Sequence, residues 1–357
     1  MIVQRLLPTH SFKRSIIQEL YVDKGSVGLK AFMEARDYDA ALWVELINKY
    51  PKFWTSIRKN NLQAKKQAKA IEVSLNRFRK LYPEMRPAKI YFTVGGLRSG
   101  GTITDDMVLV GAEIATADQA TDATELSDWL RNVFKNQHST NLIGLNVDEY
   151  VHTQQKSNGS TFLAKSIGEG SADFISELVT GKINRSAYTV YGRQHEAQLK
   201  ESFKIDMFST EMSNWLYNGS SVTHADLGYF MGYAICKSYY NNQSNKKKAV
   251  KDIIELNYQD AAQVEKFLTA SKYYAELLNP TELLKKFEEL QPFVKLSLDI
   301  NLKTEVDTTL TELTLNFSQP MGPGKSISFG EGGKAHFPIT GVIGFLRIEK
   351  LSTSSFL

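Results

Sequence analysis

Three side chains that could support metal-assisted hydrolysis lie together in the segment Asp148-Glu149-Tyr150-Val151-His152. On a helix, Asp148 and His152 are four residues apart and share one face, where a carboxylate and an imidazole can hold one metal ion. Glu149 lies at the edge of that face, where it could take a proton from a metal-bound water. The segment therefore predicts a metal site with an adjacent general base.

A second pair of carboxylates, Glu169 and Asp173, follows in the segment 168–174 and repeats the four-residue spacing. The interval after His152 is long enough to end one helix, turn through residues 157–160 and begin another. If the second segment is also helical, Glu169 would point at the same metal ion. We expect Asp173 to accept the second ring N–H of His152 and so fix the tautomer of the imidazole.

The two segments together are more specific than either alone, because x-Glu-x-x-His arises often by chance. The stretch DEYVHTQQ followed by GEGSADFISELVTG resembles the gluzincin metallopeptidases. It is more closely similar to a group of predicted bacterial zinc peptidases, known mainly from exported proteins of Bacteroidetes. The phrases DKGSVGLKAF, YFTVGGLRSGGT and LGYFMGYAICKSYY also fit that group, so the resemblance covers about residues 20–290.

This resemblance implies a zinc-dependent hydrolase of peptides or proteins, with Glu149 as general base and with His152 and Glu169 as ligands. Asp148 departs from the family pattern, which has a metal-binding His there, so the chain carries a DExxH variant of the motif. A carboxylate at this position makes the ligand set harder and more negative, which favours Mn²⁺ or Mg²⁺ or leaves the site without metal. The site is therefore expected to be either active or weakened.

Two other functions stay open on the sequence alone. One is a catalytically degenerate, peptidase-like module of the cell envelope that only binds peptide or protein. The other is a helical envelope scaffold that binds its partners through the C-terminal β region. The resemblance points to export or to the cell envelope, but the first twenty residues lack the continuous apolar core of a signal peptide.

Composition excludes several classes of function. The chain has 357 residues, 42% of them hydrophobic, which is enough for one large domain or two. A net charge of +4 is too mild to indicate a nucleic-acid partner. Cys236 is the single cysteine, which excludes an intrachain disulfide and a cysteine-based zinc site. No apolar run is long enough for a transmembrane segment.

The pattern of apolar residues predicts an α+β fold, with a mainly helical, gluzincin-like domain over residues 1–290. Residues 28–85 are expected to be helical, followed by strands at 90–94 and 107–114. These two strands form either a plain hairpin or a sheet edge that holds an extended peptide, as in gluzincins. Helices are then expected at five places, namely 125–134, 141–156, 161–181, 194–218 and 226–240.

The helix predicted at 226–240 carries four residues of interest. Gly228 and Gly232 are one turn apart, which allows close helix packing. Tyr229 and Tyr233 share the neighbouring face, where they could bind substrate and donate a hydrogen bond to a tetrahedral oxyanion. The alternative is that both tyrosines are half-buried core residues.

The composition changes after Phe293. Leu313, Leu315 and Phe317 alternate with polar residues, as on a half-buried strand. The stretch LTLNFSQPM resembles a strand and turn of bacterial Ig-like domains. Because a β-sandwich normally needs about 100 residues, we expect residues 293–357 to form a partial β-sandwich-like segment that packs on the first domain.

Overall fold

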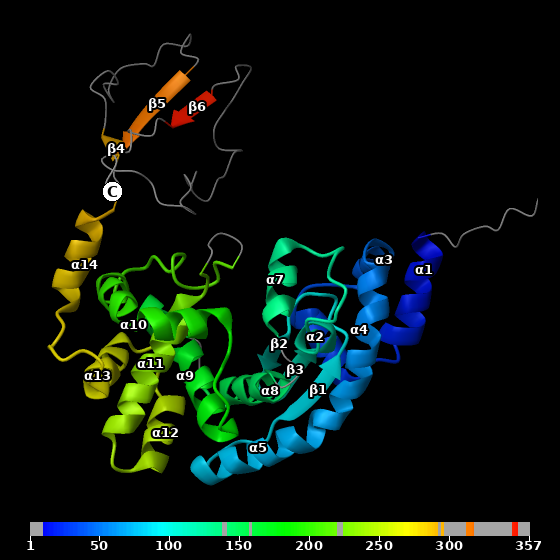
Figure 1. Cartoon of the computed structure of the whole chain (residues 1–357), viewed down its shortest axis with the longest axis horizontal. Coiled ribbons are helices and arrows are strands. Elements are labelled where there is room, and N and C mark those ends of the chain that lie inside the picture. Colours follow the sequence, from blue (N-terminus) through cyan, green and yellow to red (C-terminus); the bar gives the residue numbers. More distant parts are fainter. Residues whose placement is uncertain are drawn as a thin grey trace, which may run out of the picture.

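The computed structural model describes residues 10–137, 141–156, 159–219 and 224–291, together with three short strands nearer the C-terminus. Helices dominate this part of the chain, and a small three-stranded sheet lies among them (Figure 1). The predicted α+β class with a mainly helical domain is therefore confirmed. None of the helices in these ranges is long and apolar enough to span a membrane.

The region predicted as helical at 28–85 is divided into several helices. Each break has a local cause: Ser26 and Asp39 cap new helices with their side chains, and Pro51 occupies the first turn of another. The elements of this region are α1 (His10–Ile17), η1 (Gln18–Val22), α2 (Val27–Ala35), α3 (Ala40–Lys49), α4 (Pro51–Gln63), η2 (Ala64–Gln67) and α5 (Ala68–Leu81).

The sheet consists of β1 (Lys89–Thr93), β2 (Gly101–Thr104) and β3 (Met107–Gly111), in the order β1-β3-β2. Of the two alternatives for the strands at 90–94 and 107–114, the plain hairpin is wrong, because β1 and β3 run parallel. The hairpin is instead formed by β2 and β3, which are antiparallel. The sequence of β2 holds one large apolar residue, Ile103, and so gave no alternating pattern from which the strand could be predicted.

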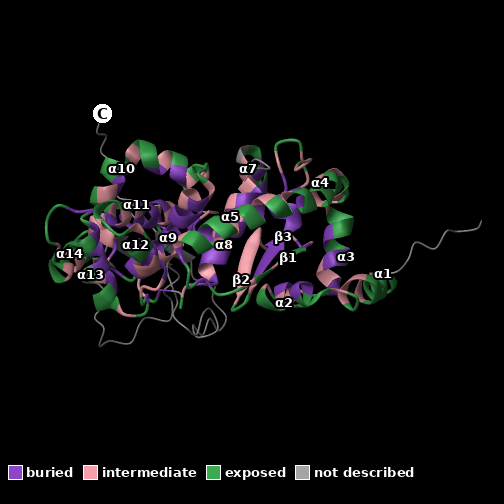
Figure 2. Ribbon diagram, turned by 90° about the horizontal axis from the view of Figure 1, so that it is seen from below, coloured by how far each residue is buried: buried purple, intermediate pink, exposed green. Residues whose placement is uncertain are grey.

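The two faces of the sheet are covered by helices, with α8 (Asn141–His152) on one side and α2 on the other, and α5 packs against α8 (Figure 2). Val108 and Val110 of β3 pack with Val147 and Tyr150 of α8 in the main core. β2 is left as an edge strand beside α8, and its four residues are all half-buried. The polar face of α8 therefore lies next to an open sheet edge.

The helices predicted at 125–134, 141–156, 161–181 and 226–240 are present with shifted ends, whereas the strand predicted at 107–114 ends at Gly111, where the short helix α6 begins. The helix predicted at 194–218 instead runs from Ala187 to Asp206, with a non-helical residue at His195, and a turn follows at Met207. The remaining helices are α6 (Ala112–Ala115), α7 (Asp128–Asn136), α9 (Phe162–Thr180), α10 (Ala187–Asp206), α11 (Leu227–Asn242), α12 (Lys246–Ile254), α13 (Ala261–Ser271) and α14 (Pro280–Glu289).

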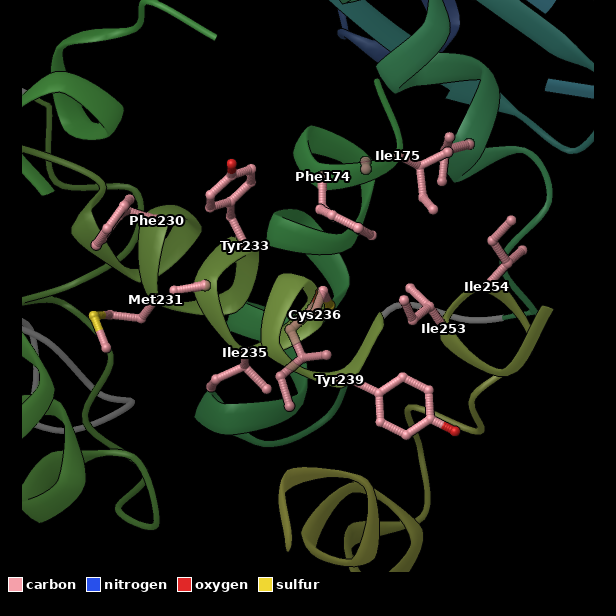
Figure 3. Packing of buried hydrophobic residues seen from close by; sticks show 14 of the residues in the cluster. Phe174, Ile175, Phe230, Met231, Tyr233, Ile235, Cys236, Tyr239, Ile253 and Ile254 are labelled. Atoms are coloured by element: carbon pink, nitrogen blue, oxygen red, sulfur yellow. The ribbon is translucent and has the colours of Figure 1, made fainter. Parts of the chain in front are cut away.

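Helices α9 and α11 cross at close range, as predicted for Gly232, whereas Gly228 packs against Leu216 and Trp215. A Cβ atom at Gly232 would overlap the backbone of Ser166, and one at Gly170 would overlap the backbone of Gly232 and Tyr233. Figure 3 shows the side chains of the two helices interleaved around this crossing, with buried Cys236 among them. Burial raises the pKa of Cys236 well above its usual range, so this thiol is a core residue.

Three strands are described in the C-terminal segment: β4 (Val294–Lys295), β5 (Glu312–Phe317) and β6 (Phe345–Ile348). β5 pairs antiparallel with β4 and parallel with β6. The strand predicted from the alternation at Leu313 and Leu315 is therefore confirmed. The rest of the predicted sandwich over 293–357, and its packing on the first domain, lie outside the described residues.

Candidate metal and peptide site

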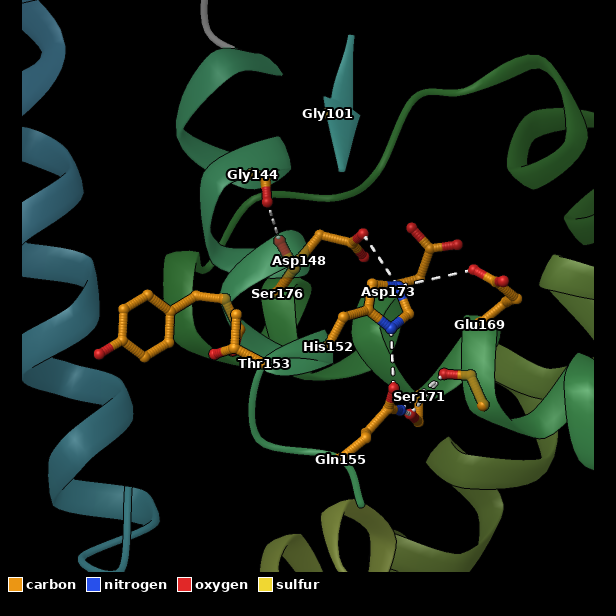
Figure 4. A network of polar contacts seen from close by, with 12 residues as sticks. Gly101, Gly144, Asp148, His152, Thr153, Gln155, Glu169, Ser171, Asp173 and Ser176 are labelled. Carbon is orange, nitrogen blue, oxygen red and sulfur yellow. Dashed lines mark hydrogen bonds and ion pairs between the residues drawn. The ribbon is translucent and has the colours of Figure 1, made fainter. Parts of the chain in front are cut away.

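The predicted motif residues lie on two neighbouring helices. α8 carries Asp148, Glu149 and His152, and α9 carries Glu169 and Asp173. The two helices pack side by side, and the Ser176 hydroxyl of α9 donates a hydrogen bond of 2.9 Å to the Gly144 carbonyl of α8 (Figure 4).

The start and end of α9 are set by local sequence. The Thr161 side chain accepts from the Ala164 N–H at its start, and Gly181 ends it with a φ of +67°. Gly181 is therefore the C-cap of α9. These signals place the turn with Glu169 next to the turn with His152.

His152 is the centre of the cluster. Its Nε2 atom is 3.7 Å from Asp148 Oδ2 and 3.5 Å from Glu169 Oε2 (Figure 4). Ligand atoms that share a tetrahedral zinc at about 2.0–2.2 Å are themselves about 3.3–3.6 Å apart. Both separations are close to this value, so the approach of Glu169 to His152 that the spacing predicted is present.

The orientation of His152 is fixed by Gln155, which the sequence analysis missed. Gln155 Nε2 donates to the Gly168 carbonyl and to the Ser171 hydroxyl, at 3.0 and 2.8 Å. Its Oε1 atom therefore faces His152 Nδ1, 2.7 Å away, and accepts the proton that this nitrogen carries. In the neutral imidazole this leaves the lone pair on Nε2, directed at Asp148 and Glu169.

The predicted contact between Asp173 and His152 is wrong. Asp173 accepts hydrogen bonds from the Tyr188 hydroxyl at 2.9 Å and from the Asn184 side chain. Gln155 lies one turn beyond His152 on the same chain segment and reaches Nδ1 first, whereas Asp173 faces the start of α10. Asp173 therefore belongs to the wall of the site. Burial raises its pKa to about 7, although the hydrogen bonds from Tyr188 and Asn184 lower it.

Glu149 points toward the sheet edge. A Cβ atom added to Gly101 of β2 would lie 2.8 Å from Glu149 Cδ, so strand and carboxylate touch only because residue 101 has no side chain. Burial raises the pKa of Glu149 to about 7, although the His152 and Arg36 charges oppose this. A carboxylate with a pKa near neutrality suits proton transfer at physiological pH.

The cluster has a large excess of acid. Burial, and next the charge of Asp173, raise the pKa of Asp148 well above its usual range. Burial alone would lower the pKa of His152, but Glu169, Asp148 and Glu149 reverse this and raise it to about 9. With side-chain exposures of 16% for His152, 23% for Asp148 and 25% for Glu169, the cluster is open enough for a ligand to reach.

The described part of the chain holds no group of three or more His, Cys, Asp or Glu side chains arranged together as a metal site. The carboxylates of Asp148 and Glu169 approach His152 separately, from its own helix and from α9.

Tyr229 and Tyr233, predicted to line the cleft, lie in different surroundings. The ring of Tyr229 packs against Tyr188 and Tyr217, within the electrostatic range of Glu169. The Tyr233 hydroxyl donates to Glu177 at 2.7 Å and accepts from Arg193 and Lys237, so it belongs to an ion-pair network outside the His152 cluster.

Tyr217 is a second residue that the sequence analysis missed. Its hydroxyl donates to Glu169 Oε1 at 3.0 Å, on the oxygen that does not face His152. The residue has a left-handed backbone with φ of +58°, and it is 60% exposed. The Asn218-Gly219 turn that follows was the available sequence signal, but it does not show where the ring points. His195 and His224 stack on Tyr191 and do not join the cluster.

A cavity of about 930 Å³ opens beside the cluster, between α8, the second half of α9 and the loop that leads to α10. Asp148, Asp173 and Tyr188 line it near the cluster, and Lys182 and Arg185 line it on the exposed loop. Its volume is in the range of pockets that bind small molecules or several residues of a peptide. The chain matches no protein-family model, no curated protein and no solved structure.

Proposed function

We propose that this chain is a metal-dependent peptidase in which Asp148, His152 and Glu169 hold a divalent cation and Glu149 is the general base. The observation that carries the proposal is the approach of Glu169, from a different helix, to within 3.5 Å of His152 Nε2. Asp148 approaches the same nitrogen from its own helix, and Glu149, whose pKa burial raises to about 7, is its neighbour in the sequence.

The side chains present fit a cation. Asp148 and Glu169 approach the imidazole of His152, Glu149 and Asp173 lie within electrostatic range of it, and no Lys or Arg of the described residues forms an ion pair with any of the four. Like charges held together out of water raise one another's pKa, and an opposite charge relieves this. The donor set of one nitrogen and two carboxylates suits Zn²⁺, and its hardness also admits Mn²⁺.

When bound, such an ion supplies a Lewis acid that polarises a carbonyl and lowers the pKa of a water molecule. Gln155 keeps the proton of His152 on Nδ1 and so keeps Nε2 available. Glu149 accepts the proton of the attacking water and returns it to the leaving amine. Tyr217 holds the second oxygen of Glu169 and restricts the rotation of that carboxylate.

The open edge of β2 can bind an extended peptide as an additional strand. The Gly111 N–H donates to the Gly100 carbonyl, so residue 100 faces β3. In an antiparallel pair alternate residues face the partner, and Gly101 and Ile103 therefore direct their backbone groups to the open edge. A peptide that pairs with this edge by strand addition would pass directly beside Glu149.

A second candidate is a peptide-binding module without catalysis. The open edge of β2 and the adjoining cavity favour it, because a peptide could bind to either of them without a metal ion. Asp148 is the residue on which the choice depends, since its carboxylate reaches less far from the helix than an imidazole.

The test is to purify the chain, measure bound metal by mass spectrometry and follow cleavage of a peptide pool with zinc or manganese added. We expect metal-dependent cleavage that falls by about 10²–10⁴-fold in Glu149→Gln. Stoichiometric metal with unchanged cleavage in Glu149→Gln would assign the activity to another group. No metal uptake and no cleavage would leave the binding module.

A further inference from the structure

Arg36 lies at the open edge of β2, although it is more than one hundred residues away from the motif in sequence. It is the first residue after α2, and its Nη2 atom donates to the Gly101 carbonyl at 3.4 Å. Gly101 is the residue that touches Glu149. The guanidinium and the proposed general base therefore lie on two sides of one glycine.

The guanidinium of Arg36 uses little of its hydrogen-bonding capacity. Arginine has five N–H donors in a planar fork. Among the described residues only the long bond to Gly101 uses them, and Arg36 forms no ion pair there. Its Nε atom is buried and without a partner. A buried, unsatisfied donor on a charged group is unfavourable unless a ligand completes it.

The part of the β2 edge that can pair with an added strand ends at Gly101, beside Arg36. The Gly101 carbonyl faces the open edge but already accepts from Arg36 and from the Ser99 hydroxyl. A peptide strand added to β2 could pair at Ile103, but it would find this last acceptor occupied. The geometry therefore suits a peptide whose chain ends near Arg36 better than one that continues past it.

We propose that Arg36 binds a substrate carboxylate, so that the peptides taken by this site present a C-terminal carboxylate just beyond the bond at Glu149. A carboxylate matches the two parallel N–H groups of the guanidinium fork, which a neutral amide does not. The assignment rests on the proposed peptidase function, because it uses Glu149 to define the reacting position. The same chemistry could come from a glutamate side chain at the last residue.

The experiment measures binding in a Glu149→Gln background, so that no probe is consumed. Three fluorescein-labelled pentapeptides of alternating alanine and valine serve as probes: one with a free C-terminal carboxylate, one amidated, and one amidated with glutamate as its last residue. Fluorescence polarisation is recorded with the full chain. We expect the free carboxylate to bind at least about tenfold more tightly than the amide, as is typical when a charged hydrogen-bonded pair is formed.

Arg36→Gln should remove this preference while the affinity for the amidated peptide is kept, and Arg36→Lys should keep part of it because the charge remains without the fork. Arg58→Gln, on the exposed surface of α4, is the matched control and should change nothing. If the amidated glutamate peptide binds as tightly as the free acid, and only with Arg36 present, the carboxylate site is supported and its source is a side chain.

Equal binding of acid and amide, a preference that survives Arg36→Gln, or no binding of any probe would overturn the assignment. Circular dichroism shows whether each variant is folded. If Arg36→Gln does not fold, the change in carboxylate preference is measured with Arg36→Lys. Failure of the peptidase proposal looks different. It would appear as a carboxylate preference in binding together with no metal-dependent cleavage by the chain with Glu149 intact.

Discussion

Replacing Gly101 by alanine should disable the proposed peptide cleavage without unfolding the protein. The new methyl group would lie 2.8 Å from Glu149 Cδ and 2.9 Å from Cγ. Because carbon atoms pack at about 3.5–4.0 Å, the Glu149 side chain must move by roughly 1 Å. The atoms that must move belong to a flexible side chain, so the strand itself can stay in place.

The size of both effects follows from this displacement. An off-rotamer side chain costs about 0.5–1.5 kcal/mol, so the free energy of unfolding should fall by no more than about 1.5 kcal/mol. A misplacement of about 1 Å in a reacting group can lower the rate by about 10²-fold. Catalysis and stability should therefore separate: kcat should fall far more than the thermal midpoint changes.

The assay pairs metal-dependent peptide cleavage with thermal unfolding. Gly100→Ala is the matched control, because its methyl group would meet Ile114 at 3.2 Å and not Glu149. We expect Gly100→Ala to keep cleavage within a small factor of the parent. Full activity in a folded Gly101→Ala protein would refute the argument, since it would show that the Glu149 carboxylate is not needed where this structure places it.

Three further outcomes are expected. Asp148→His should raise zinc affinity in calorimetry and raise peptide cleavage, because it completes a His₂Glu set with His152 and Glu169; no gain in zinc binding would favour the binding module. Gln155→Leu should weaken metal binding by about 10–100-fold, as loss of a ligand-orienting partner does, and unchanged affinity would show that His152 is held in another way. Burial raises the pKa of Glu113 to about 7 although two backbone N–H groups oppose this. The unfolded chain therefore loses this proton first, and urea unfolding should show stability falling by up to about 3 kcal/mol between pH 4.5 and 7. That slope should be smaller in Glu113→Gln, and an equal slope would contradict the raised pKa.

The shared face of Asp148 and His152 was predictable because positions four apart lie on one side of a helix. The approach of Glu169 was expected from the combined motif and its resemblance to the gluzincins, since spacing within one helix does not place a second helix beside it. The structure places Glu169 beside His152 as this expectation requires. The partner of His152 Nδ1 was not predictable in the same way. Gln155 and Asp173 were both within plausible reach, and the packing of α8 against α9 decides between them.

The sheet edge and Arg36 could not be predicted for a different reason. β2 contains Gly-Thr-Ile-Thr, which has too few apolar residues to show a strand period, and it forms because β3 offers it a partner. Arg36 comes from a helix on the opposite face of the sheet, and nothing local in the sequence links it to residue 149. When two residues meet only through the tertiary structure, no spacing in the sequence predicts their contact.

The acid excess in the cluster argues for a ligand and against a purely structural role. Burial raises the pKa of Asp148, Glu149 and Asp173, so each carboxylate is less stable in the folded chain than in the unfolded one at neutral pH. A core built for stability alone would hold apolar residues here or balance every acid with a base. A cation held by Nε2 of neutral His152 would supply the positive charge that these carboxylates lack. The destabilisation therefore lies where a cation can offset it, beside a cavity and an open strand edge, which is where a binding centre is expected.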